Sequence, residues 1–357
     1  MEHLNNITQL LDLMVCPAFC VKDGRITYAN QDAARSGICT DASVNELLIT
    51  GQQEYAGFQD GSLYLTVRVA GVQLGATVSR LQGLDIFVLD QDSEQSQLQT
   101  MALAAQELRA PLSNIMAVAD DLFPMASQEE DPTAQALVAR INRGLYQMLR
   151  IVGNMSDAYR YSKDAESQME FRDVCSIWDE FWAHSAELVS HAGITLKYSG
   201  LRESVTCLID IEKLERAASN MLSNAIKFTP KGGTIDVRLS RTGSMLYLTV
   251  QNSGNVIPEQ LRGSLYSRYL RQPGIEDSRF GIGLGMVLIR SAATAHGGTV
   301  LMEHLQDQGT RITMTMQIRQ DSGNSVRSPI LRVDYAGERE HKLIELSETL
   351  PPELYGK

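Results

Sequence analysis

The sequence predicts a multidomain α+β protein with three structural units and a C-terminal extension at 321–357. Residues 1–92 hold β-rich runs separated by glycines, which predicts a small α/β unit with an antiparallel sheet. Residues 93–161 repeat apolar residues at three- and four-residue steps in two long stretches, which predicts two amphipathic helices. Residues 162–320 mix periodic helical segments with strand pairs, which predicts helices on one face of a mixed sheet.

The composition is that of a globular protein. The chain has 357 residues, of which 43% are hydrophobic and 21% are charged, enough to bury several cores. A formal net charge of −11 without a Lys/Arg cluster argues against nucleic acid as a partner. The longest apolar runs contain charges or proline and fall short of a membrane span, and no signal peptide is evident. We therefore expect a cytoplasmic protein without a membrane partner, sensing an internal signal.

The 1–92 unit begins with a helix, then two strands around a Lys-Asp-Gly turn and a short helix. Three further β-rich runs complete an antiparallel sheet. This layout resembles a PAS sensor domain, whose turn motif G-x-I-x-x-x-N is matched by Gly24, Ile26 and Asn30. An unrelated small α/β domain is the alternative.

The two predicted helices carry apolar stripes that one hairpin does not cover. Such an antiparallel helical hairpin buries its stripes by pairing with a second copy, forming a dimeric four-helix bundle. A hairpin packed on its own chain is the alternative. Pro111 predicts a bend in the first helix. Charged substitutions at Leu112 and Leu145 are expected to break a homodimer. The stripes consist of Leu98, Met101, Ala105, Leu108, Leu112, Ile115, Ala119 and Leu122, then Leu137, Ile141, Leu145, Met148, Val152 and Met155.

A polar row lies on the most periodic helix of the 162–320 unit. Asn220 and Asn224 are four residues apart and Lys227 is three further on, so that all three line one helix face. Amide oxygens suit Mg²⁺, and a neighbouring lysine suits a phosphate. The alternative is a helix with a solvated polar face.

Three blocks together resemble a sensor histidine kinase. They are QELRAPL at 106–112, NMLSNAIKFTPKGG at 220–233 and GIGLG at 281–285, in the family's order and rough spacing. The resemblance implies a PAS-like sensor, a dimerising hairpin and a two-layer α/β sandwich ATPase domain of the Bergerat type, shared with gyrase and heat-shock chaperones. It implies ATP and Mg²⁺ as cofactors, with Asn224 as the Mg²⁺ ligand.

On the same resemblance, Asn220 and Lys227 would approach the phosphates, and the segment LTVQNSGNVIPE would form the adenine site. The family pattern there is D-x-G-x-G-I, whose aspartate accepts a hydrogen bond from the adenine amine. Asn252 replaces that aspartate, Gly254 is kept and Val256 replaces the second glycine. Replacing a charged acceptor by a neutral one costs about 1 kcal/mol of binding free energy, which lowers the ATP affinity by roughly five- to tenfold. A β-branched Val256 also resists a positive φ angle.

Gly281, Gly283 and Gly285 match the family's glycine-rich box, whose backbone N–H groups approach phosphates. The G-x-G-x-G spacing and the polar lead-in exclude a dinucleotide-binding motif. LYSRYLR resembles the family's aromatic block, in which Arg271 would reach the terminal phosphate; a surface arginine is the alternative. Thr310, after a glycine in the last hairpin, matches the final block of the family.

The phosphoacceptor is where the chain departs from the family. Gln106 stands where the family has the histidine that carries the phosphoryl group, while Glu107 keeps the family's general base. Ala110 replaces the Thr or Asn that orients water for dephosphorylation, and no histidine lies between His3 and His184. We therefore expect no autophosphorylation on the 93–161 helices. Structural or surface roles are expected for His184, His191, His296 and His304.

The sequence thus predicts a histidine-kinase-family protein of two-component-type signal transduction that binds ATP weakly. It would signal by conformation or through a partner, which could be a response regulator or a partner histidine kinase. Two alternatives stay open: a dimeric scaffold without a nucleotide, and a kinase that uses another acceptor. The 321–357 tail is expected to add a strand, ILRVDY, and a helix, HKLIELSETL, to the sheet edge.

Overall fold

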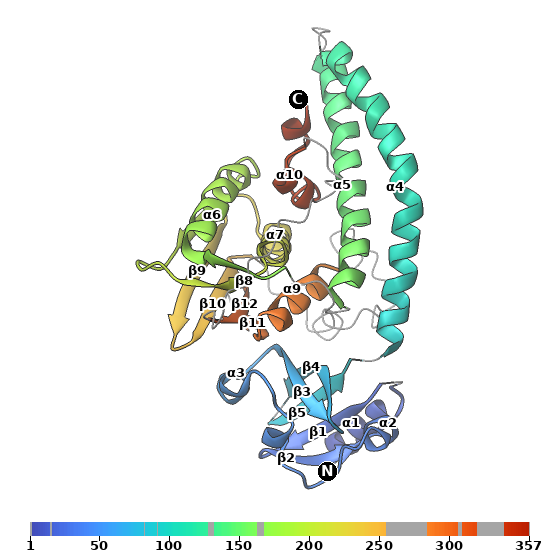
Figure 1. Cartoon of the computed structure of the whole chain (residues 1–357), viewed down its shortest axis with the longest axis vertical. Coiled ribbons are helices and arrows are strands. Elements are labelled where there is room, and N and C mark those ends of the chain that lie inside the picture. Colours follow the sequence, from blue (N-terminus) through green and yellow to red (C-terminus); the bar gives the residue numbers. More distant parts are fainter. Residues whose placement is uncertain are drawn as a thin grey trace.

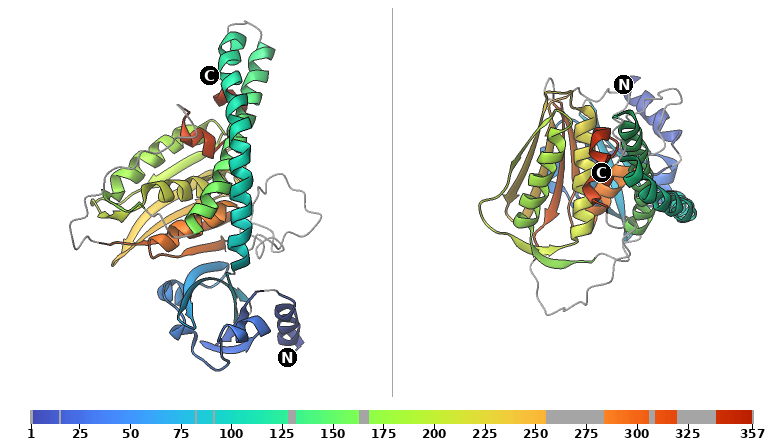
Figure 2. Two further views of the ribbon diagram at one scale, coloured as in Figure 1. Left: turned by 45° about the vertical axis from the view of Figure 1, so that its right-hand side comes forward. Right: turned by 90° about the horizontal axis from the view of Figure 1, so that it is seen from above.

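A computed structural model gives the fold of the chain as two α/β lobes and a long helical hairpin (Figure 1). The N-terminal lobe lies at one end of the long axis, and the hairpin extends to the other end (Figure 2). No helix in the described ranges is long and apolar enough to cross a membrane. The structure describes residues 2–14, 16–81, 83–90, 92–127, 132–162, 168–254, 284–305, 309–319 and 339–356.

The N-terminal lobe is an antiparallel sheet in the order β2-β1-β5-β4-β3 with short helices around it. Asn30 ties its first segments together, because its buried side chain accepts from Ala18 N and Ala33 N and donates to Leu11 O and Cys16 O. The elements are α1 (Glu2–Asp12), β1 (Ala18–Lys22), β2 (Arg25–Ala29), α2 (Gln31–Arg35), α3 (Gln52–Gly57), β3 (Ser62–Val69), β4 (Val72–Leu81) and β5 (Leu84–Leu89).

The hairpin consists of α4 (Asp92–Ser127) and α5 (Pro132–Ser162), and α4 continues unbroken through Pro111. The apolar stripe divides between two faces of α4. Leu112 and Leu145 are buried at 6% and 3% exposure in the seam between the two helices of the same chain. A charge at either position would therefore disrupt the hairpin itself. An apolar row on the two helices remains exposed, namely Leu103, Leu108, Ile115, Val118, Leu122, Leu137, Ile141 and Met148.

The second lobe packs α6, α7 and α9 on one face of a five-stranded sheet (Figure 1). Its strand order is β11-β12-β10-β9-β7, with only β7 and β9 parallel. The pair β6–β8 forms a separate two-stranded sheet. The elements are β6 (Glu170–Asp173), α6 (Val174–Ser190), β7 (Thr195–Ser199), β8 (Thr206–Ile209), α7 (Ile211–Phe228), β9 (Thr234–Thr242), β10 (Met245–Asn252), α9 (Leu284–Ala295), β11 (Val300–Leu305) and β12 (Gly309–Gln317).

The two lobes share one sheet, because β3 pairs antiparallel with β11 to give ten strands. Gly61 allows this approach, since a Cβ there would lie 1.9 Å from Met302 O. Arg290 of α9 adds a second contact: its guanidinium lies 4.8 Å from the Tyr64 ring centroid and 3.8 Å from the Asp90 carboxylate. The N-terminal lobe is therefore joined to the second lobe through both a strand edge and a charged side chain.

The C-terminal segment, residues 339–356, packs on α5 and α7 and not on the sheet edge, so the predicted position of its helix is wrong. The segment forms α10 (His341–Glu345) and a short 3-10 helix, η3 (Pro352–Tyr355). Its apolar side chains pack in the main core of the second lobe, where Leu350 is completely buried and Tyr355 is 2% exposed. The predicted strand ILRVDY lies outside the described residues.

His296 fixes the start of α7. Its ring is buried at 1% exposure; Nε2 accepts from the backbone N–H of Asp210 at 2.9 Å, so Nδ1 is the donor to Ala292 O at 2.7 Å. Asp210 in turn caps α7 by accepting from Lys213 N. Burial lowers the pKa of His296 to about 4, so the ring is neutral at physiological pH.

This neutral histidine predicts a stability loss in mild acid. The unfolded chain takes up a proton near pH 6.5, whereas folded His296 does so only near pH 4, so its contribution to stability is complete above 6.5 and declines as the pH falls to 4. The loss is about 3 kcal/mol. His296→Gln keeps a donor and an acceptor without titrating in this range. Urea unfolding at pH 7 and pH 4 should show a smaller loss of unfolding free energy in His296→Gln than in the wild-type chain. Equal losses in the two proteins would contradict the prediction.

Candidate nucleotide-binding site

The polar row on α7 faces neighbouring helices. Asn220 is buried at 1% exposure; it donates to Arg216 O at 2.8 Å and accepts from Arg150 of α5 at 3.5 Å. Gly285, in the first turn of α9, lies against the same side chain, and a Cβ there would be 2.8 Å from Asn220 Oδ1. Gly285 therefore lets α9 approach α7 closely, which is a packing role distinct from the predicted phosphate contact.

Asn224 keeps an oxygen available. Its side chain is half-buried, and its amide nitrogen donates to Met286 Sδ at 4.0 Å, the single hydrogen bond of this side chain within the described part of the chain. The amide oxygen is the kind of hard ligand that Mg²⁺ takes alongside water and phosphate oxygens.

Lys227 is already paired. Its ammonium group forms an ion pair with Glu348 of the C-terminal segment, and its side chain is 13% exposed. Burial lowers the pKa of Lys227, and the attraction of Glu348 opposes part of that shift. The lysine that the sequence assigns to a phosphate thus contacts a carboxylate of the same chain.

Asn252 and Thr310 come together at the end of the sheet, directly opposite each other on β10 and β12. Asn252 Oδ1 accepts from Thr310 N at 3.3 Å, and Asn252 Nδ2 donates to Phe228 O at 3.4 Å. Thr310 Oγ1 is buried without a hydrogen-bond partner in the parts of the chain that the structure covers. Gly254 fits beside them because a Cβ would lie 1.5 Å from Phe228 O. A buried hydroxyl of this kind is suited to a ligand or a water.

Three predicted residues of the hairpin lie apart from this cluster. Gln106 and Glu107 are exposed on α4, as is Ala110. Four further predicted positions lie outside the described residues: Val256, Arg271, Gly281 and Gly283.

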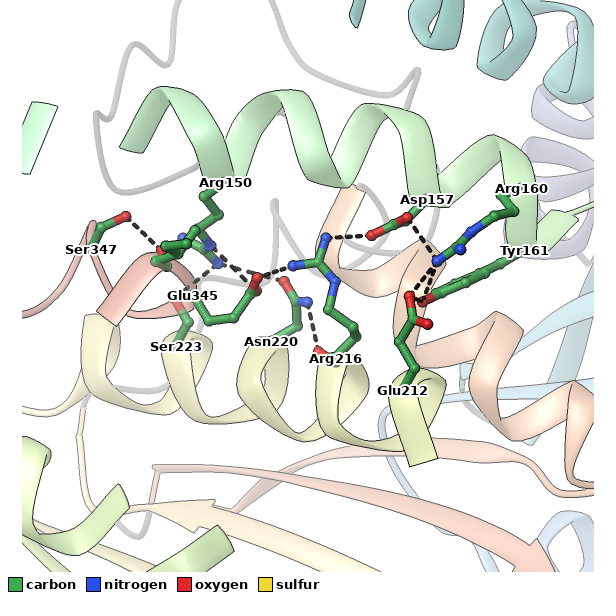
Figure 3. A network of polar contacts seen from close by, with 11 residues as sticks. Arg150, Asp157, Arg160, Tyr161, Glu212, Arg216, Asn220, Ser223, Glu345 and Ser347 are labelled. Atoms are coloured by element: carbon green, nitrogen blue, oxygen red, sulfur yellow. Dashed lines mark hydrogen bonds and ion pairs between the residues drawn. The ribbon is translucent and has the colours of Figure 1, made fainter. Parts of the chain in front are cut away.

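A charged network between α5, α7 and the C-terminal segment was not predicted from the sequence (Figure 3). Arg150 and Glu345 are buried at 5% and 4% exposure, and Arg216 contacts both Asp157 and Glu345. An arginine next to the apolar positions of a predicted helix could have indicated this network. An arginine in such a position is buried, and a buried arginine requires an anionic partner. The identity of that anion could not be read from the sequence.

The fold and the cluster define an ATPase domain. Residues 209–320, which include α7 and the Asn252–Thr310 pair, match the family described as "Histidine kinase-, DNA gyrase B-, and HSP90-like ATPase". The full-length structure of ShkA in complex with AMPPNP has a TM-score of 0.50 and 18% identity, covering 63% of this chain and 47% of that one. At this identity the likeness supports the fold alone.

Curated relatives extend the likeness beyond the ATPase domain. Sensor histidine kinase WalK of Bacillus subtilis is 24% identical over 254 residues, covering 68% of this chain and 41% of WalK. Sensor histidine kinase CusS of Escherichia coli is 27% identical over 218 residues, covering 59% of this chain and 44% of CusS. This chain belongs to the sensor histidine kinase family, and it spans less than half the length of either relative.

The geometry of Asn252 refines the expected effect of Asn252→Asp. A carboxylate restores the charged acceptor for an adenine amine, which alone would tighten Mg-ATP binding by about five- to tenfold. The same change replaces the donor to Phe228 O by an oxygen. We therefore expect tighter binding by less than tenfold, together with a lower Tm.

Calorimetric titration with Mg-ATP measures the first effect and thermal unfolding the second. Asn224→Ala serves as the matched variant on the phosphate side, where binding should weaken instead. Equal or weaker affinity in Asn252→Asp would remove the adenine role of this position.

Proposed function

We propose that this chain binds Mg-ATP weakly and acts in two-component-type signal transduction without phosphorylating its own hairpin. The observation that carries the nucleotide part is the Asn252–Thr310 pair, because a buried hydroxyl with no hydrogen-bond partner among the described residues lies beside an amide at the end of the sheet. The match of residues 209–320 to the ATPase family supports the same reading.

The residues present fit Mg-ATP. Asn252 would accept a hydrogen bond from the adenine amine, since a carbonyl oxygen has a second lone pair beyond the one used by Thr310 N. Asn224 would offer its amide oxygen to Mg²⁺, and Asn220 and Lys227 would lie on the phosphate side. The bound nucleotide would supply a transferable phosphoryl group.

The hairpin departs from the chemistry of the family. A phosphoacceptor must present a nucleophilic lone pair, and the Gln106 amide nitrogen is conjugated with its carbonyl. Glu107 is exposed beside it and has no histidine proton to accept. A partner histidine kinase could supply the acceptor in a mixed dimer, and a response regulator is the corresponding downstream partner.

Two further assignments complete the proposal. The N-terminal lobe is PAS-like, which the structural role of Asn30 and the antiparallel strand order β2-β1-β5-β4-β3 support. The exposed apolar row on α4 and α5 is the homodimer surface, since Leu108, Ile115 and Leu122 follow one another at seven-residue steps with 49%, 53% and 55% exposure.

A dimeric scaffold without a nucleotide is the second candidate. The Lys227–Glu348 ion pair favours it, because the lysine expected to bind a phosphate is neutralised within the chain. The labelling and binding experiments below separate the two candidates.

The exposed row predicts the oligomeric state. The wild-type chain should be a dimer by light scattering at micromolar concentration, and Ile115→Glu combined with Ile141→Glu should give a monomer. Ser113→Glu is the control, since Ser113 is an exposed α4 residue about 200° around the helix from Ile115. A monomeric wild-type chain would rule out the homodimer.

Restoring the acceptor tests the catalytic part. Gln106→His should label slowly with radioactive ATP, and the label should be acid-labile because phosphohistidine is. Gln106→His with Asn224→Ala is the control and should stay unlabelled. Acid-labile label on the wild-type chain, mapped to residues 93–161, would overturn the proposal, whereas an unlabelled repaired protein would favour the scaffold.

A further inference from the structure

The C-terminal segment places two carboxylates against the cations of the candidate phosphate side. Glu348 lies 2.9 Å from Arg150 Nη1 and also pairs with Lys227 Nζ. Glu345 pairs with Arg216 and lies 4.0 Å from Arg150 Nε. Figure 3 shows Arg150 and Glu345 between the ribbons of α5 and α7.

The cations of this contact are shielded from bulk water, whereas the Glu348 side chain is 27% exposed. The side chains of Arg150 and Glu345 are each 6% exposed, and that of Lys227 is 13% exposed. Buried cations require an anionic partner, because leaving one unpaired is strongly destabilising. If Glu348 left, another anion would have to take its place beside Arg150 and Lys227.

The segment also has an attachment that does not depend on its carboxylates. Arg143 of α5 donates to Ser347 O at 2.8 Å and to Glu348 O at 3.0 Å, and Asn142 donates to Tyr355 O at 2.8 Å. The Tyr355 ring packs edge-on against Tyr146 of α5 at 5.0 Å. Backbone and apolar contacts therefore hold the segment on the hairpin, and Glu348 reaches from there to α7.

Carboxylate and phosphate oxygens are recognised by the same donors. Arg150 Nη2 also donates to Ser223 Oγ on α7 at 3.2 Å, so its guanidinium is held in place on the polar row. Arginine and lysine together form the kind of cation pair that binds a phosphate. Burial alone would raise the pKa of Glu348, but Arg150 and Lys227 outweigh it and lower the pKa, so the carboxylate is charged at neutral pH.

We propose that residues 339–356 are an autoinhibitory plug in which the Glu348 carboxylate occupies the position of a nucleotide phosphate at Lys227 and Arg150. Mg-ATP and the docked segment then exclude each other. This inference rests on the proposed nucleotide binding, and it adds Arg150 of the hairpin as a phosphate-side residue. Displacement of the segment from α5 would couple nucleotide binding to the hairpin.

The first test is Glu348→Gln in the full chain, titrated calorimetrically with Mg-ATP. Removing the charge while keeping the size should tighten binding by about tenfold, the size expected for one charge-assisted contact. Glu353→Gln is the matched control, because Glu353 is an exposed carboxylate of the same segment and should leave affinity unchanged.

The second test needs no variant. Hydrogen exchange of residues 341–355 in the wild-type chain should become faster when saturating Mg-ATP is added. The plug is overturned, and the nucleotide function stands, if three results coincide. These are that the wild-type chain binds Mg-ATP, that Glu348→Gln binds it equally well, and that the rate of hydrogen exchange is unchanged. If neither protein binds at millimolar nucleotide, both proposals fall. Binding that appears only in Glu348→Gln supports both.

Discussion

The buried guanidinium of Arg150 connects three segments that lie far apart in the chain. It belongs to α5, contacts Asn220 and Ser223 on α7, and pairs with Glu348 of the C-terminal segment. Because a buried cation must be neutralised, this requirement sets where the C-terminal segment docks and how α7 faces the hairpin. The polar face of α7 therefore carries both the proposed nucleotide site and a contact inside the chain.

The N-terminal lobe contacts the ATPase lobe at β11 and α9. Its strand β3 extends the sheet of the ATPase lobe, and Arg290 links α9 to Tyr64 and Asp90. Since α9 also packs against α7 through Gly285, a change in the N-terminal lobe has a short physical route to the polar row. The hairpin contacts α9 as well, so both flanking units meet the ATPase lobe at one helix.

Local patterns predicted much of the fold, because they depend on residues close in sequence. The helices expected over 93–161 lie at 92–127 and 132–162, and β9 and β10 form one of the strand pairs expected in the 162–320 unit. Patterns were less informative where one periodic stripe serves two surfaces. Leu112 and Ile115 belong to the same stripe, yet one lies in the seam and the other is exposed, since three residues turn a helix by about 300°.

The sequence by itself determined the family, the order of the blocks and the absence of a histidine at position 106, because these are properties of residue identity and spacing. Only the tertiary structure decided that Lys227 pairs with Glu348, that Asn252 is engaged by Thr310 and Phe228, and that the two lobes share a sheet. These contacts join residues far apart in sequence. Their partners are chosen by shape and by the need to pair buried charges and hydrogen-bonding groups, which no local periodicity encodes.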